Sequence, residues 1–176
     1  MITLSRRWKS WGYVLVWTLT IYSTLSLARP VCEFLRERIA LGFFINAAVI
    51  LSFLGLSVVV LSHSKGFFAR AVFVLAGLGY GLGLITLELP EEKIHFFEYG
   101  FLAFLVFKAF RVDCSRLSSF YLSLILTTAL GFIDEVIQGI LPNRYFQWSD
   151  VFLNMASALL GLLIVYSQRE ENVLNN

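Results

Sequence analysis

The sequence predicts an all-α protein, a polytopic transmembrane bundle of about six helices. Two observations predict this class. In composition, 58% of the 176 residues are hydrophobic, 17 are Phe and only 15% are charged, and one soluble core of this length cannot bury so much apolar surface. In pattern, the apolar residues gather in runs close to the roughly 20 residues that a membrane-spanning helix needs. We therefore expect the lipid bilayer, and no nucleic acid, as the main partner.

Six apolar segments are separated by short polar connections. They cover residues 12–28, 40–62, 67–89, 94–110, 117–141 and 151–167. The chain divides accordingly into three N-terminal helices (residues 1–87), three further helices (residues 88–167) and a polar C-terminal tail (residues 168–176). The longest connection, residues 29–39, mixes apolar and charged residues in the pattern of a short interfacial helix.

The first apolar segment has two interpretations. A basic cluster at residues 6–9 precedes it and Ser-Leu-Ala ends it at residue 28, which is also the pattern of a cleavable signal peptide. Its apolar run begins at Trp11 and is longer than most signal-peptide cores. We therefore expect a retained membrane anchor.

The distribution of Lys and Arg orients the helices. With the N-terminus in the cytoplasm, nine of the 14 basic residues lie on the cytoplasmic side, as the positive-inside rule favours. These nine are Arg6, Arg7, Lys9, Lys65, Arg70, Lys108, Arg111, Arg116 and Arg169. Three arginines in the first outer connection oppose this orientation. We expect both termini in the cytoplasm and a multi-pass protein of the plasma (inner) membrane.

A polar segment opens the fourth apolar helix. His95 lies three or four residues from Glu92, Glu98 and Tyr99, and this spacing places all four on one helix face. Lys93 lies in the same segment. In the expected topology, the connections around residues 88–93 and 142–149 lie on the same outer side of the membrane. The polar residues of the fourth, fifth and sixth helices therefore converge.

A second polar group joins the fifth and sixth helices. Its members are Asp134, Glu135 and Gln138, then Arg144 in the connection, then Asp150 and Asn154. Asp134 lies about 10 Å below the helix end at 1.5 Å per residue. An ionised Asp deep in a span costs roughly 2.5–3.5 kcal/mol, so we expect Arg144 to be its counter-ion.

This polar cluster has two interpretations. It could only hold the three helices together by hydrogen bonds and ion pairs, which give a modest gain each in membranes. It could also be a ligand or proton-transfer site, because ionisable groups inside membranes are typically functional. We favour the second interpretation.

The residue types suggest roles in such a site. The candidate catalytic residues are His95, Asp134, Glu135 and Asp150. Imidazole exchanges protons near neutral pH, and crowded carboxyls can hold a proton between them, which together suits acid–base chemistry. The Arg144 guanidinium fits phosphate or carboxylate at two points. The other candidate ligand-binding residues are Glu92, Lys93, Tyr99, Gln138 and Asn154.

A metal site is an alternative use of the same residues. His95 with the surrounding carboxylates offers the oxygen-rich set that divalent cations take. However, the sequence has no His-Glu-x-x-His pair or Cys cluster, and Arg144 in the same site would repel a cation. We expect no metal and no cofactor.

These motifs resemble the VanZ-like family, named for a factor associated with low-level resistance to the glycopeptide teicoplanin. The resemblance covers about residues 88–163. It rests on Glu92, Lys93, His95 and Tyr99, then Asp134, Glu135 and Gln138, then Pro142 and Arg144, and finally Asp150 and Asn154. Two positions depart from the family pattern. Glu92 stands where Asp is frequent, and Ser157 stands where Gly commonly occurs, which predicts slightly looser packing of the sixth helix.

The resemblance implies a role at the cell envelope, linked to glycopeptide-antibiotic resistance. One interpretation is an enzyme that acts on an anionic lipid-linked or glycopeptide substrate at the outer leaflet. The alternative is a protein that binds or shields envelope precursors without chemistry. A third, proton-coupled transport, predicts activity that collapses with the proton gradient, but the paired interrupted helices of many transporters are not evident. The sequence leaves catalysis and oligomeric state open.

Overall fold

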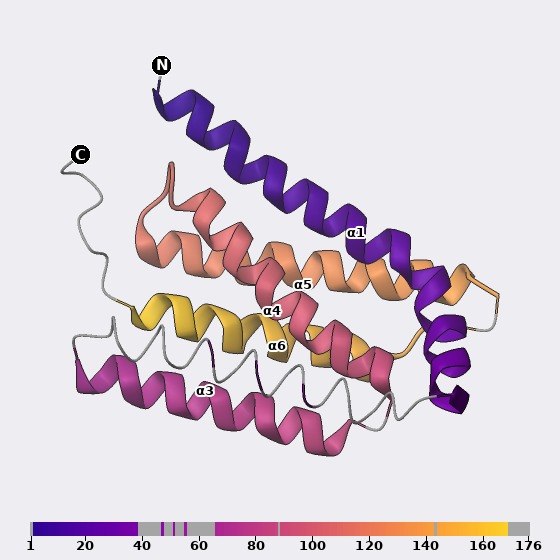
Figure 1. Cartoon of the computed structure of the whole chain (residues 1–176). Coiled ribbons are helices and arrows are strands. Elements are labelled where there is room, and N and C mark those ends of the chain that lie inside the picture. The colour runs from indigo at the N-terminus through magenta and orange to yellow at the C-terminus, as the bar shows by residue number, and fades with distance from the viewer. Residues whose placement is uncertain are drawn as a thin grey trace.

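The computed structural model describes residues 2–38, 66–87, 89–142 and 144–168, together with the single positions 47, 51 and 55. The described part is all-helical, with no strand, and Figure 1 shows its helices. They are α1 (Ile2–Arg38), α3 (Phe67–Thr86), α4 (Pro90–Phe110), α5 (Arg116–Ile140) and α6 (Trp148–Ser167). The predicted all-α class is therefore confirmed. The expected span over residues 40–62 lies outside the described residues, except for positions 47, 51 and 55.

Helices α3 to α6 begin and end within four residues of the predicted limits. The largest shift is at α4, which begins at Pro90 in its first turn. Proline is favoured there because its missing N–H would have no helical partner. Helix α5 begins after Ser115, whose side chain accepts a hydrogen bond from the Ser118 N–H. Helix ends follow such local signals, whereas hydropathy detects only the apolar part of each helix.

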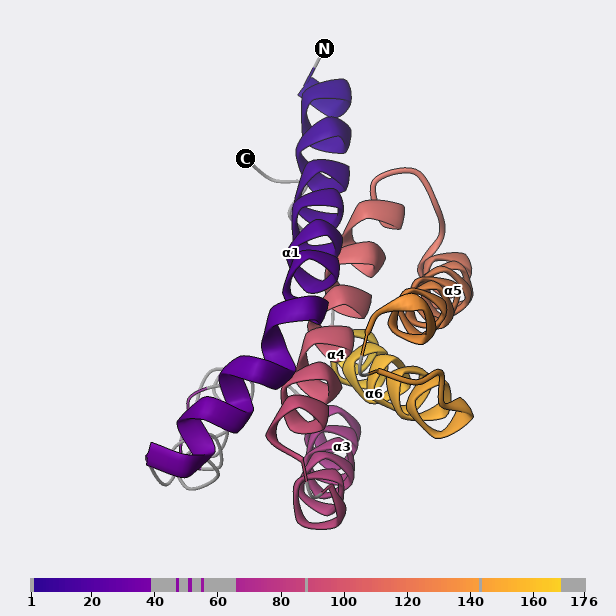
Figure 2. The same ribbon diagram turned by 90° about the vertical axis from the view of Figure 1, so that its right-hand side faces the viewer.

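Helix α1 differs from the prediction. A span over residues 12–28 and a separate interfacial helix after it were expected, but one helix runs from Ile2 to Arg38. Pro30 lies inside it, and Figure 2 shows the ribbon changing direction toward its C-terminal end. A proline removes one helical hydrogen bond and bends the helix. The pattern of residues 29–39 therefore belongs to the continuation of α1, and the expectation of a separate helix was wrong.

Two of the described helices, α5 and α6, are long and apolar enough to cross a membrane. Helix α3 contains a shorter apolar segment, Phe67–Gly83. Together with the composition, these helices indicate association with a membrane.

Helix α4 lies at the centre of the bundle and packs against α1, α5 and α6, while α3 packs mainly on α6 (Figures 1 and 2). Two apolar clusters form the core. One joins α1, α4 and α5 around Ile21, Tyr99 and Val106. The other joins α4, α5 and α6 around Phe107 and Leu162.

Helices α4 and α6 approach each other so closely that their backbones touch. A Cβ atom added to Gly161 would lie 2.5 Å from the carbonyl oxygen of Gly100. Ser157, one turn earlier on α6, is fully buried and donates a hydrogen bond to the Phe96 carbonyl. Tyr80 of α3 donates to the Ser157 carbonyl at 3.1 Å. The looser packing expected from Ser157 is thus wrong, because its hydroxyl binds the neighbouring backbone.

We predict that Gly161→Ala lowers the free energy of unfolding by about 1–3 kcal/mol, because the new methyl group meets backbone that cannot move aside. Thermal unfolding in detergent micelles measures the effect. The matched control is Gly81→Ala on α3, where nothing lies within 4 Å of an added Cβ. Equal stability of the two variants would refute the close contact between α4 and α6.

Candidate polar site

The start of α4, the end of α5 and the start of α6 lie at the same end of the bundle (Figure 1). Two hydrogen bonds join them at this end. Tyr99 of α4 donates to Asp134 of α5 at 2.9 Å, and the backbone N–H of Gln147, just before α6, donates to Glu135 Oε2 at 3.3 Å. The structure therefore brings together the two polar segments that the sequence indicated.

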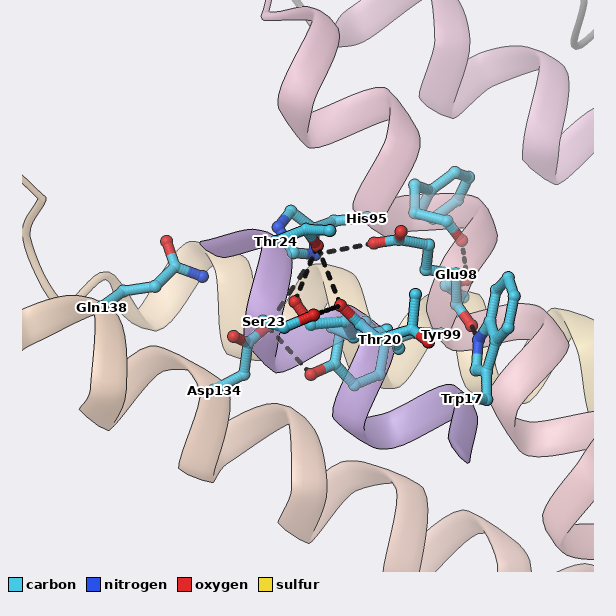
Figure 3. Close-up of polar contacts among 12 residues, drawn as sticks. Trp17, Thr20, Ser23, Thr24, His95, Glu98, Tyr99, Asp134 and Gln138 are labelled. Atoms are coloured by element: carbon cyan, nitrogen blue, oxygen red, sulfur yellow. Dashed lines mark hydrogen bonds and ion pairs between the residues drawn. The ribbon is translucent and has the colours of Figure 1, made fainter. Parts of the chain in front are cut away.

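Asp134 is the most deeply placed acid of this site. Its side chain is 0% exposed, and Tyr99, also 0% exposed, donates to its Oδ2. His95 Nδ1 lies 3.8 Å from the same oxygen (Figure 3). A carboxyl, a phenol and an imidazole are thus gathered in an apolar bundle, where an unpaired charge is costly.

Glu98 also belongs to the site, although it is not among the candidate catalytic or ligand-binding residues predicted from the sequence. Its Oε2 lies 3.3 Å from His95 Nδ1, one helical turn away on α4. The spacing of three residues placed it on the same face, but the family motif skips this position. His95 therefore lies between two carboxyls, Glu98 on its own helix and Asp134 on α5 (Figure 3).

Two atoms of this group are buried without a hydrogen-bond partner, His95 Nδ1 and Asp134 Oδ1. Although Nδ1 is near both carboxyls, it makes a well-oriented hydrogen bond to neither. Buried polar atoms in native proteins are nearly always satisfied, so such atoms call for an explanation. A bound ligand, water or transferred proton at this point would satisfy both.

Glu135, Gln138 and Arg144 form a second chain of contacts, which leads from two buried side chains to the half-buried Arg144. The Gln138 amide donates to Glu135 Oε1 at 3.1 Å, and its oxygen accepts from Arg144 Nε at 3.0 Å. Arg144 Nη2 donates to the same oxygen. Arg144 was expected to be the direct counter-ion of Asp134. In the described residues its hydrogen bonds lead through Gln138 to Glu135 instead, because one amide can join a donor to an acceptor.

Asp150 and Asn154 occupy different depths of α6. Asp150 is half-buried and accepts a hydrogen bond from Ser149 of its own turn at 3.1 Å. It interacts electrostatically with Arg144 and Glu135. Asn154 is 3% exposed and lies against Gly131 of α5, where an added Cβ would be 3.0 Å from its own Cβ. Asn154 is therefore packed against α5 one helical turn before Asp134, whereas Asp150 is nearer the end of α6.

Glu92 and Lys93 lie in the first turn of α4 and are half-buried. Glu92 is one turn before His95 and Lys93 is two residues before it, at the same end of the bundle. The structure thus places all the predicted site residues at one end, but at two levels. Six are buried, namely Asp134, Tyr99, Glu135, Asn154, Gln138 and His95, whereas Glu92, Lys93, Arg144 and Asp150 are half-buried at the rim.

Helix α1 contributes two contacts that sequence reasoning missed. Trp17 Nε1 donates to the Glu98 carbonyl at 3.2 Å, and the Tyr22 hydroxyl donates to the Leu130 carbonyl at 2.8 Å. Leu130 lies one turn before Asp134 on α5. One bond joins α1 to α4 and the other joins α1 to α5. Together they fix the distance between α4 and α5 beside the site. The family motif did not include them because it begins at α4.

The described residues offer no group of three or more His, Cys, Asp or Glu side chains arranged to hold a metal ion. The donors that do gather are one imidazole, several carboxyls, a phenol and a guanidinium. This set is suited to holding and moving protons and to binding an anion at its rim.

The comparisons with known proteins agree with the motif analysis. Residues 91–169 match the family model described as VanZ/LLP1. The matched region includes α4, except its first residue, and all of α5 and α6, and hence most of the site. The suspected VanZ-like resemblance is therefore confirmed for this region. Neither the curated proteins nor the solved structures gave a match.

We predict that Tyr99→Phe destabilises the bundle by about 1–3 kcal/mol, because it leaves a buried carboxyl oxygen without its donor. Thermal unfolding in detergent micelles measures the loss. The control is Tyr121→Phe on α5, where the side chain is 56% exposed. A loss no larger than that of the control would mean that the Tyr99–Asp134 bond does not support the fold.

Proposed function

Since residues 91–169 match the VanZ/LLP1 family, we propose that this chain is a VanZ-like multi-pass protein of the plasma membrane. Its polar site binds an anionic ligand of the cell envelope, either a lipid-linked phosphate or a glycopeptide, at the outer leaflet. Through this ligand the protein acts in glycopeptide-antibiotic resistance. Resistance to teicoplanin is the role that the family resemblance implies.

The proposed topology has six spans, with both termini in the cytoplasm and the site facing outward. The direction of the described helices supports it. Arg7 of α1 pairs with Asp113 after α4 at 3.2 Å, so α1 begins at the end opposite the site. Helix α3 also begins at that end, since Gly83, near its C-terminus, packs on Phe96 beside the site. Helices α1 and α3 therefore begin at the same end of the bundle, as the proposed six-span topology requires.

Arg144 is the proposed anchor for the anionic ligand. A guanidinium has five N–H donors, and those of Arg144 that bind Gln138 are on Nε and Nη2. Three donors remain, two on Nη1 and one on Nη2, and Arg144 is half-buried at the rim of the site. Phosphate and carboxylate groups suit such a fork-shaped donor. Lys93 and Asn154 are further candidate ligand contacts.

The observation that carries the catalytic form of the proposal is the pair of unsatisfied buried atoms, His95 Nδ1 and Asp134 Oδ1. They lie on two neighbouring side chains, behind the rim that Arg144 occupies. In this form His95 accepts a proton from the ligand, and Glu98 and Asp134 stabilise the imidazolium that results. The buried Glu135 and the half-buried Asp150 interact electrostatically with Arg144.

A second function, binding or shielding without chemistry, is favoured by Glu135. Both of its oxygens already accept hydrogen bonds, one from Gln138 and one from the Gln147 N–H. A carboxyl held in this way is an effective structural link between helices. In this function the site displays Arg144 to the ligand and performs no proton transfer.

We predict that His95→Gln and Asp134→Asn each reduce conversion of the ligand by about 100-fold or more, the usual contribution of a general acid or base. The assay incubates purified protein with undecaprenyl-linked and peptidoglycan intermediates and follows each by mass spectrometry. The control is Asp113→Asn, an exposed carboxylate at the opposite end. If the wild type binds a compound without converting it, and His95→Gln binds equally, the shielding function holds and catalysis is excluded.

We further predict the sidedness of the connections. In a variant without Cys32 and Cys114, a membrane-impermeant maleimide should label Tyr145→Cys on intact cells, because this exposed residue lies in the outer connection before α6. Asp113→Cys, between α4 and α5, should react only after the membrane is opened. The reverse pattern would contradict the proposed orientation.

A further inference from the structure

The described part of the chain contains five buried side-chain atoms without a hydrogen-bond partner. They are Ser123 Oγ, Thr127 Oγ1, Thr128 Oγ1, Asp134 Oδ1 and His95 Nδ1. Four of the five belong to α5, and the fifth is the imidazole that lies beside Asp134. Unsatisfied polar atoms scattered at random would not gather on one helix.

Three hydroxyl residues repeat at every fourth position of α5: Ser119, Ser123 and Thr127. We call them the hydroxyl row. All three are fully buried, and a spacing of four places them on one helix face. The next position in the register is Gly131, where the space is occupied by Asn154 of α6. A polar side chain thus lies at this position of the register, one helical turn before Asp134.

The hydroxyl row lies between the two apolar clusters of the core. Leu126 and Leu130 of α5 pack on the cluster with α1 and α4, whereas Phe120 and Leu124 pack on the cluster with α4 and α6. Apolar side chains therefore flank the row along the bundle. The row begins one turn from Ser115 at the start of α5, which is the end opposite the site.

Packing alone does not account for these hydroxyls. A hydroxyl that only fills space in a helix usually binds the carbonyl one turn back, as Ser119 does to Ser115 at 2.8 Å. Ser123 and Thr127 do not make this bond, although nothing else in the described structure satisfies them. Their hydroxyls are therefore available to donate and accept along the row.

The spacing of the row suits water. Side chains four residues apart on a helix have Cβ atoms about 5–6 Å apart, which is too far for one hydroxyl to reach the next. A single water between them would make two bonds of about 2.8 Å each. A row of hydroxyls alternating with water is a chain along which a proton can pass, because each member accepts one proton and releases another.

We propose that the hydroxyl row is a proton path that connects the Asp134 site with the opposite face of the membrane. It rests on the membrane-spanning arrangement of the proposed function and extends it. Protons pass from the start of α5 along Ser123 and Thr127 to Asp134. They then reach His95 and the part-exposed Glu98. The other ionisable groups around this exit are Tyr22 of α1, Glu135 of α5 and Arg144 at the rim.

The test measures proton flux into vesicles that contain the purified full chain and a pH-sensitive dye, driven by a potassium diffusion potential and without any envelope ligand. We expect flux above that of protein-free vesicles. Thr127→Val removes the hydroxyl with little change of shape and should lower the flux about tenfold. The matched control is Thr86→Val on α3, an exposed hydroxyl that binds its own helix, and it should leave the flux unchanged.

Two further variants guard against misfolding. Thr127→Ser keeps a hydroxyl and should conduct, whereas Ser123→Ala should lower the flux as Thr127→Val does. A wild type that conducts no more than empty vesicles would overturn the proposal, and so would equal flux in Thr127→Val and the wild type. Because no ligand is present, flux that persists while ligand binding fails would overturn the proposed function alone.

Discussion

The constraint on which the rest of this structure depends is the burial of Asp134 inside an apolar bundle. A carboxyl in such surroundings must find donors or hold a proton, because its solvation by water is lost. Tyr99 supplies one donor from α4, and His95 lies within 3.8 Å of the same oxygen. Tyr99 and His95 both belong to α4. The need of the buried Asp134 on α5 for hydrogen-bond donors therefore fixes how α4 and α5 face each other.

Close packing of the helices makes this arrangement possible. The backbone contact between Gly100 and Gly161 brings α6 against α4. The absence of a side chain at Gly131 leaves room for Asn154 between α5 and α6. On the other side, Trp17 and Tyr22 tie α1 to backbone carbonyls of α4 and α5. Small residues thus let α4, α5 and α6 pack closely beside the site. Hydrogen bonds from α1, which lies outside the region matched to the family, hold α4 and α5 on the other side.

The amino-acid sequence predicted the helices and the place of the site for identifiable reasons. Long apolar runs predicted α3 to α6, and helical spacing of three and four placed Glu98 and Tyr99 beside His95. The continuation of α1 through Pro30 was not predictable, because tertiary packing decides whether a proline ends or bends a helix. The link from Arg144 through Gln138 was missed for a similar reason. Sequence spacing shows which charges are near, but side-chain geometry decides which hydrogen bonds form.

The most direct measurement of the central claim is the distance between the His95 imidazole and the Asp134 carboxyl in a lipid bilayer. Solid-state NMR on protein with ¹⁵N-labelled His and ¹³C-labelled Asp reports it as a dipolar coupling. Because His95 Nδ1 lies 3.8 Å from Asp134 Oδ2, the structure predicts a measurable coupling between Nδ1 and the Asp134 carboxyl carbon, which disappears in Asp134→Asn. Absence of any such coupling in the wild type would show that the two side chains do not meet, and would contradict the shared site.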